Sequence, residues 1–150
     1  MVRTILALGA YATLALAAYP LAASEQVALS RAVFLETATS TPSGRMRSIA
    51  PAESVSRGDK VILVVEWRAP THSKGFTVSS PVPAHLTYAR SSDDSVEVSV
   101  DGGRNWGLLD STRMGSRKAT PEDVTHLRWR IPAHKARSGS GRITYSAFVR

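Results

Sequence analysis

Apolar and polar residues alternate with a period of two along most of the chain after its first two dozen residues, which is the pattern of half-buried β-strands. The first expected strand places Val27, Leu29, Val33 and Leu35 on one face. The run 61–67 is the most apolar, and its first half is apolar on both faces, which predicts a central strand covered on two sides. Pro70 ends this strand, because proline donates no backbone hydrogen bond.

Shorter segments continue the pattern toward the C-terminus. Strands are expected over 45–49, 76–80, 86–90, 96–101, 127–131 and 143–149, with a return strand that begins at Trp106. The small and polar segment 37–44 is expected to be a loop, and 120–123 a single helical turn opened by Thr120 and Pro121. Eight or nine short strands without a helical period predict an all-β protein, an antiparallel β-sandwich.

The first residues differ from the rest and predict a cleavable signal peptide over 1–24. Arg3 is the one early charge, an apolar run covers 5–19, Pro20 interrupts it, and Ala22, Ala23 and Ser24 supply a small-residue cleavage site. The apolar run is shorter than the roughly 20 residues that a spanning helix needs. We therefore expect an exported protein, periplasmic or extracellular, with a single mature domain over 25–150 and no membrane span after cleavage.

The chain contains no cysteine, which excludes disulfides, thiolate metal sites and thiol catalysis. His72, His85, His126 and His134 lack metal-site spacing and are expected at the surface. Four acidic residues crowd one segment without the spacing of a calcium loop, so solvated loop acids are favoured over a calcium site: Asp93, Asp94, Glu97 and Asp101. We expect no metal and no cofactor.

Basic residues are concentrated in the last third of the chain. Segment 104–150 has ten Lys/Arg against three Asp/Glu, whereas 25–103 has eight against nine. This asymmetry is typical of sites for acidic polymers, although arginines on solvated strand faces produce it too. Nucleic acid is not an expected partner of an exported chain without interleaved aromatic residues. The possible anion-binding surface comprises Arg113, Arg117, Arg128, Arg130, Lys135, Arg137 and Arg142.

Residues 99–106 match the Ser-x-Asp-x-Gly-x-Thr-Trp hairpin known as the Asp-box, with Asn105 in the threonine position. We expect Asp101 to accept backbone N–H groups across the turn and Trp106 to anchor the hairpin in the core. The predicted structural hairpin comprises Ser99, Asp101, Gly102, Gly103 and Trp106. No serine-nucleophile signature is present, so no catalytic residue is assigned and enzymatic activity is not expected.

Several segments share their order with a known family: 58–61, 81–83 with 86–88, 99–103, 123–129 and 141–149. Over about 56–150 the chain resembles the bacterial conserved repeat domain, domain of unknown function eleven. The resemblance implies an immunoglobulin-like (Ig-like) sandwich in a surface or envelope protein, here as a single copy, and supplies no catalytic residues. Residues 69–75 stand where family members usually have an Asn-x-Gly turn, and this difference leaves the conformation of the loop open.

The function expected from these features is that of an exported, non-enzymatic structural or interaction module of the cell envelope, whose partner is an envelope protein. A first alternative is a binding protein for an anionic envelope polymer or glycan, through the arginine-rich final third. A second is an envelope hydrolase, which requires a cleft with convergent titratable groups.

Overall fold

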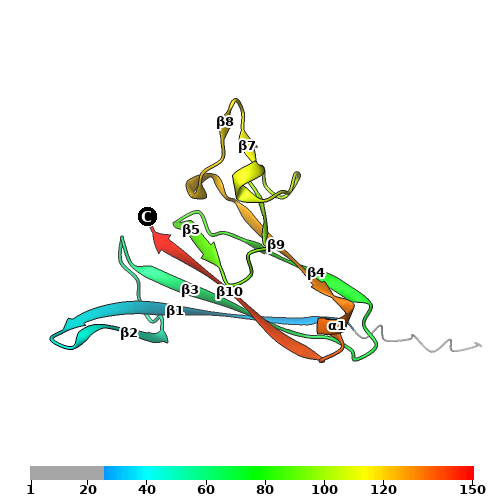
Figure 1. Ribbon diagram of the computed structural model, residues 1–150, viewed down its shortest axis with the longest axis horizontal. Coiled ribbons are helices and arrows are strands. Elements are labelled where there is room, and N and C mark those ends of the chain that lie inside the picture. The colour runs from blue at the N-terminus through cyan, green and yellow to red at the C-terminus, as the bar shows by residue number, and fades with distance from the viewer. Residues whose placement is uncertain (1–25) are drawn as a thin grey trace, which may run out of the picture.

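A computed structural model describes residues 26–150, which form an all-β structure of antiparallel sheets (Figure 1). The larger sheet has the strand order β2-β1-β3-β10-β5 and the smaller sheet the order β4-β9-β6. The larger sheet consists of β1 (Ala28–Thr41), β2 (Gly44–Pro51), β3 (Lys60–Arg68), β5 (Leu86–Ser91) and β10 (Ser140–Val149). The smaller consists of β4 (Gly75–Pro81), β6 (Glu97–Ser99) and β9 (His126–Pro132).

Short elements join these strands. A small hairpin of β7 (Arg113–Met114) and β8 (Arg117–Lys118) stands apart from both sheets, and α1 (Ala133–Ala136) is a single helical turn between β9 and β10 (Figure 1). Leu109–Ser111 and Pro121–Asp123 form 3₁₀ turns. Thr120 and Asp123 form a reciprocal capping box at the start of the second turn, as the helix-start pattern predicts.

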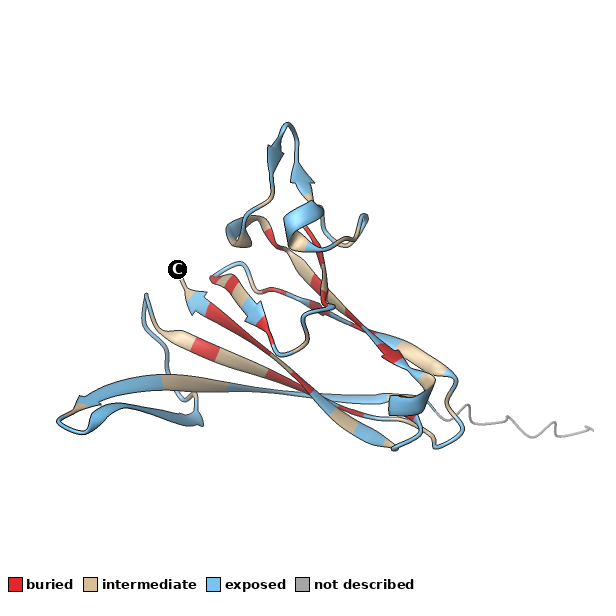
Figure 2. Cartoon of the chain, viewed as in Figure 1, coloured by how far each residue is buried: buried red, intermediate tan, exposed pale blue. Residues whose placement is uncertain are grey.

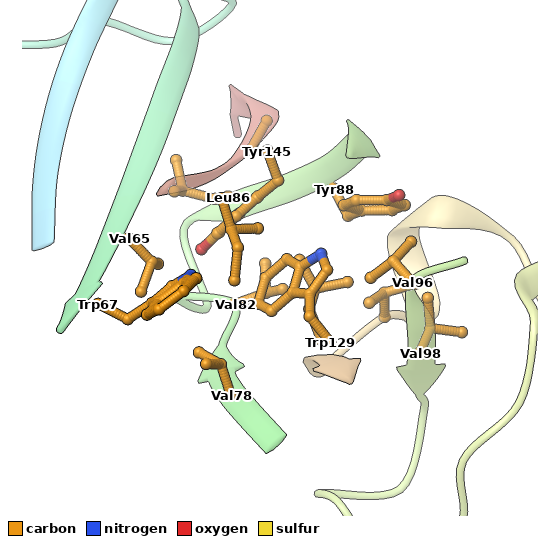
Figure 3. Close-up of a cluster of buried hydrophobic side chains, with 14 of the residues drawn as sticks. Val65, Trp67, Val78, Val82, Leu86, Tyr88, Val96, Val98, Trp129 and Tyr145 are labelled. Atoms are coloured by element: carbon orange, nitrogen blue, oxygen red, sulfur yellow. The ribbon is translucent and has the colours of Figure 1, made fainter. Parts of the chain in front are cut away.

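The core lies between the two sheets and is built from the inward positions of both. Val61, Val65 and Trp67 face inward from β3, while Leu127 and Trp129 face inward from β9. Figure 3 shows Val65, Trp67 and Trp129 within this core. The indole N–H of Trp129 donates a 3.0 Å hydrogen bond to Ser91 Oγ, so the polar atom of this buried ring is satisfied.

The two sheets differ in width, and the larger extends beyond the smaller on the side of β1 and β2. Leu29 and Val33 lie on the face of β1 that is turned toward the core, yet their side chains remain 45% and 43% exposed. Residues 37–48, here called the arm, pair only as β1 with β2 and project past the end of β3 (Figure 2). Part of an apolar sheet face is therefore left uncovered.

The alternation of residues predicted most strands correctly. The inward positions of β9, with Arg128 and Arg130 on the opposite face, are confirmed, as are β2, β4, β5 and β10. The loop predicted for 37–44 is wrong, because Thr37, Thr39 and Thr41 continue β1 and the chain turns only at 42–43. β-Branched threonines favour the pleated backbone even where nothing is buried.

Two other strand predictions are corrected. The central place of β3 is confirmed, but the covering of its second face is only partial, because Val64 is buried there while Ile62 is half-buried and Glu66 exposed. The return strand predicted from Trp106 is absent within the described residues, where only Gly107 pairs with Val98. The predicted signal peptide, 1–24, lies outside the described residues.

Candidate functional site

The turn that follows β6 is organised around one carboxylate. Ser99 Oγ donates a 2.7 Å hydrogen bond to Asp101 Oδ1 and accepts the N–H of Gly103 at 2.9 Å. Oδ1 of Asp101 also accepts the backbone N–H groups of Arg104 and Asn105, at 3.1 and 3.0 Å. The side-chain amide of Asn105 donates to Asp101 Oδ2 at 2.7 Å, so asparagine supplies a donor in the position where the Asp-box usually has threonine.

Glycine is needed at the tip of this turn. Gly102 and Gly103 have φ values of +78° and +88°, which other residues rarely adopt. The Gly102 N–H donates to Thr125 Oγ1 at 3.1 Å, and that hydroxyl donates in turn to the Ser99 carbonyl at 3.1 Å. The turn is thereby tied to the segment that leads into β9.

These hydrogen bonds hold the pKa of Asp101 well below its usual range, chiefly through the Asn105 backbone N–H and side-chain amide. A carboxyl whose pKa is depressed by folding stabilises the native state above its unfolded pKa of about 4, and this contribution is lost as the pH falls toward the folded value. We expect stability to fall between roughly pH 4 and pH 2, and Asp101→Asn to be less stable at neutral pH with a shallower fall in acid. Urea unfolding at several pH values measures both effects.

Asp110→Asn is the matched control, because no hydrogen bond of the Asp110 carboxylate is found in the part of the chain that the structure describes. It should retain the wild-type dependence of stability on pH. If Asp101→Asn follows the wild-type acid curve as closely as this control does, the proposed role of the Asp101 carboxylate is wrong.

Trp106 lies on the outer face of the smaller sheet rather than in the core, so its predicted anchoring in the core is corrected. The ring is half-buried, with the Arg128 guanidinium carbon 4.5 Å from its centroid. His126 meets it edge-on, with the ring centroids 6.5 Å apart. The outward face of β9 thus provides a cation–π contact in place of apolar burial.

Glu97 joins the two central arginines of this face. Its Oε2 accepts the Arg128 Nε–H at 2.9 Å and the Arg130 Nε–H at 3.0 Å. The hydrogen bonds from Arg130 and Arg128 lower the pKa of Glu97. Trp106, Arg128, Glu97 and Arg130 form one continuous assembly, here called the outer-face cluster. It carries one positive charge in excess.

The seven basic residues predicted as an anion-binding surface do not lie together. Arg128 and Arg130 are neighbours on the smaller sheet, whereas Arg142 lies on the opposite face of the molecule, where it pairs with Glu66 at 2.6 Å. Arg117 of the β7–β8 hairpin binds Asp123 through two hydrogen bonds of 2.6 and 2.8 Å. Of the remaining three, Arg113 donates to the Ser116 carbonyl, Lys135 of α1 lines one hollow together with Arg142, and Arg137 follows α1.

A hollow of about 760 Å³ lies between the 92–95 loop and α1 and contains several titratable side chains. Asp93 is occupied within its own loop, where it accepts the N–H and hydroxyl of Ser95 at 2.9 and 2.6 Å. No hydrogen bond links Asp93 or Asp94 to His134 in the region from 26 to 150. Over the same residues, no group of three or more His, Asp or Glu side chains is arranged to hold a metal ion.

The acids considered for calcium are separated by these contacts. Glu97 is held by two arginines and Asp101 by its own turn, while Asp93 caps its loop. These three carboxylates therefore already serve as acceptors within the protein, which leaves Asp94 as the one acid of the four without such a contact among residues 26–150.

Comparison of the chain with protein-family models, with curated proteins and with solved structures found no match in any of the three. The resemblance to the conserved repeat domain therefore stays a prediction. Among the described residues, no helix has the length and apolar character needed to cross a membrane.

Proposed function

We propose that this chain is an exported, non-enzymatic interaction module of the cell envelope, built as an Ig-like β-sandwich. Two antiparallel sheets that enclose one core support the sandwich, and the leader-like segment 1–24 supports export. The partner is a protein of the envelope. The fold acts as a rigid scaffold that presents one incompletely covered sheet.

One observation carries this proposal: apolar side chains are exposed on the part of the larger sheet that extends beyond the smaller one. Leu29, Val33 and Met46 are 43–64% exposed on the face turned toward the core, where Met46 lies opposite Thr39 of β1, although all three stand in regular strands. Ile49, opposite Glu36, is 59% exposed on the other face of the same sheet. A protein that works alone rarely leaves such a surface on rigid structure, because covering apolar area is favourable by about 25 cal/mol per Å². Contact with a partner supplies this cover.

The alternative of an anionic-polymer binding protein has narrower support. Four of its seven candidate residues are engaged in ion pairs, and the set is divided between opposite faces of the molecule. The hydrolase alternative has little support, because among residues 26–150 no hydrogen bonds join the titratable side chains that line the hollow between the 92–95 loop and α1. The uncovered sheet therefore favours protein interaction over both.

Site-specific photo-crosslinking in bacterial cells that express the full chain tests the proposal. The full chain is expressed with a photoreactive amino acid at Val33 and, as a control, at Thr77 on the outer face of the smaller sheet. We expect a processed chain outside the cytosol and a crosslinked product of defined mass from Val33 that Thr77 does not give. An unprocessed chain retained in the cytosol, or identical products from both positions, would contradict the proposal.

A further inference from the structure

A groove lies between the uncovered face of β1 and strand β4, at the edge of the smaller sheet. It encloses about 250 Å³. Strands β1, β3 and β10 and the chain around the end of β4 line it, mainly with apolar groups. The lining includes Val33, Leu63, Val65, Ser80, Pro81 and Tyr145. β4 pairs with β9 on one side, and its other edge has no strand beside it in the part of the chain that the structure describes.

A buried polar group at this groove lacks a hydrogen-bond partner. The side chain of Tyr145 is almost fully buried, with the residue 1% exposed, and its Oη makes no hydrogen bond to residues 26–150. In Figure 3 this hydroxyl points away from Tyr88 and toward Val65, which also lines the groove. Burial raises the pKa of Tyr145, while the Ser80 hydroxyl, which lies close enough to donate toward Oη, and the charge of Arg31 oppose the rise. A bond donated by Ser80 would still leave the hydrogen of the Tyr145 hydroxyl without an acceptor. Buried polar groups are nearly always satisfied in native proteins, which indicates an absent acceptor.

Arg31 places a positive charge at the same groove. It occupies the inward face of β1, opposite Val65 of β3, in a row that is otherwise apolar. Its side chain is exposed and forms no ion pair or hydrogen bond within the described residues. A free guanidinium beside an apolar groove favours an occupant with a carboxylate.

The four edge strands of the two sheets, β2 and β5 in the larger and β4 and β6 in the smaller, differ in their protection. β2 carries Arg45 and Arg47, β5 carries Arg90 and β6 carries Glu97, and charged residues on edge strands discourage further pairing. β4 has no charged residue, and Pro81 interrupts its edge only at the end. The edge of β4 is therefore the one that can accept an added strand.

We propose, on the basis of the function proposed above, that the groove receives an extended acidic segment of a partner protein, which pairs with the edge of β4 as an additional strand. Alternate apolar side chains of that segment cover Val33 and Leu63, an acidic side chain meets Arg31, and an acceptor takes the Tyr145 hydroxyl hydrogen. Strand addition supplies backbone hydrogen bonds, while alternate side chains supply specificity.

A second copy of this chain fits the groove less well. The arm is its most accessible extended segment, but residues 37–48 contain Arg45 and Arg47 and no acidic residue. The whole chain carries a formal charge of +7, so two copies repel each other. Charge complementarity thus favours an acidic partner over self-association.

The test uses the chain purified after export and an acetylated, amidated nine-residue peptide in which valine and glutamate alternate. NMR titration should show saturable shifts of backbone amides in β4 and β1. A peptide with lysine in place of glutamate should bind at least about tenfold more weakly, as should the Arg31→Glu variant, because each loses the charge pair. Arg137→Glu, which makes the same change of charge after α1, should bind like the wild type.

Equal binding of both peptides, shifts confined to other strands, or an Arg31→Glu variant that binds normally would overturn the proposal. Sedimentation should show a monomer, and a dimer abolished by Val33→Lys would show that a second copy fills the groove. If the groove proposal fails in any of these ways, the Val33 crosslink to an envelope protein still tests the proposed interaction module separately.

The Tyr145→Phe variant distinguishes a role of the Tyr145 hydroxyl in peptide binding from a role in stabilising the fold. Because the hydroxyl is unpaired in the free chain, its removal should leave resistance to urea unchanged or increased. The same variant should bind the valine–glutamate peptide several-fold more weakly. A variant that is less stable yet binds the peptide normally would show that the hydroxyl serves the fold alone, and would overturn its role in the groove.

Discussion

Trp129→Ala is expected to lower the free energy of unfolding by about 3–5 kcal/mol, the usual range for truncation of a buried aromatic residue. The ring lies fully within the core, with the Tyr145 ring centroid 6.0 Å away. Alanine leaves a cavity between the two sheets and also removes the donor to Ser91 Oγ, which is then buried without that bond. Urea unfolding followed by circular dichroism measures the loss.

Trp106→Ala is the matched control for this prediction, because it removes the same side chain from the outer face of the smaller sheet. It removes the cation–π contact with Arg128 and the apolar contacts of a half-buried ring, and we expect the free energy of unfolding to fall by about 1–2 kcal/mol. A loss at Trp106 equal to or greater than that at Trp129 would contradict the placement of the two rings.

Gly141→Ala is expected to cost about 2–3 kcal/mol, although it adds only one methyl group. A Cβ atom on Gly141 would overlap the six-membered ring of Trp67 on the neighbouring strand. The ring has little freedom to move away, because it is buried and meets the ring of Phe76 edge-on at 5.2 Å. The positions of β3 and β10 must shift or the ring must leave its favoured rotamer, and both changes are unfavourable.

Ser140→Ala, at the adjacent exposed position of β10, is the control and should change stability by less than about 0.5 kcal/mol. A double-mutant cycle with Trp67→Phe identifies the cause, since a smaller ring makes space for the methyl group. The cost of Gly141→Ala should then be smaller in the chain that already carries Trp67→Phe. If the cost is the same in both backgrounds, overlap with Trp67 is not its origin.

Local sequence features account well for the strands and poorly for the candidate sites. The alternation around Leu127, Trp129 and Ile131 predicts which side of β9 is buried, because successive side chains of a strand point to opposite faces. The hydrogen bonds around Asp101 are equally local, since they join residues at most four positions apart, whereas the bond from Gly102 to Thr125 is not. The geometry around Asp101 was therefore accessible from the spacing of residues 99–106.

Contacts between distant residues were not accessible in this way. The count of charges along the sequence assigned Arg128, Arg130 and Arg142 to one surface, but the fold places Arg142 on another sheet. Each of the three also pairs with a carboxylate that is 31 or more positions away in the sequence. The groove was missed as well, although one signal was present. Arg31 interrupts the inward row of Leu29 and Val33, and a charged residue in such a row indicates that part of the face is uncovered.

By itself, the sequence determined that the chain is β-rich, which residues of each strand share a face, and where the 99–106 turn forms, because all three depend on neighbours within a few positions. Only the tertiary structure decided the order of the strands and the unequal widths of the two sheets. It also decided that Trp106 lies outside the core, and that Tyr145, Arg31 and the edge of β4 meet at one groove. These features depend on pairing across long sequence separations, where the register of whole strands, rather than any local pattern, determines which side chains become neighbours.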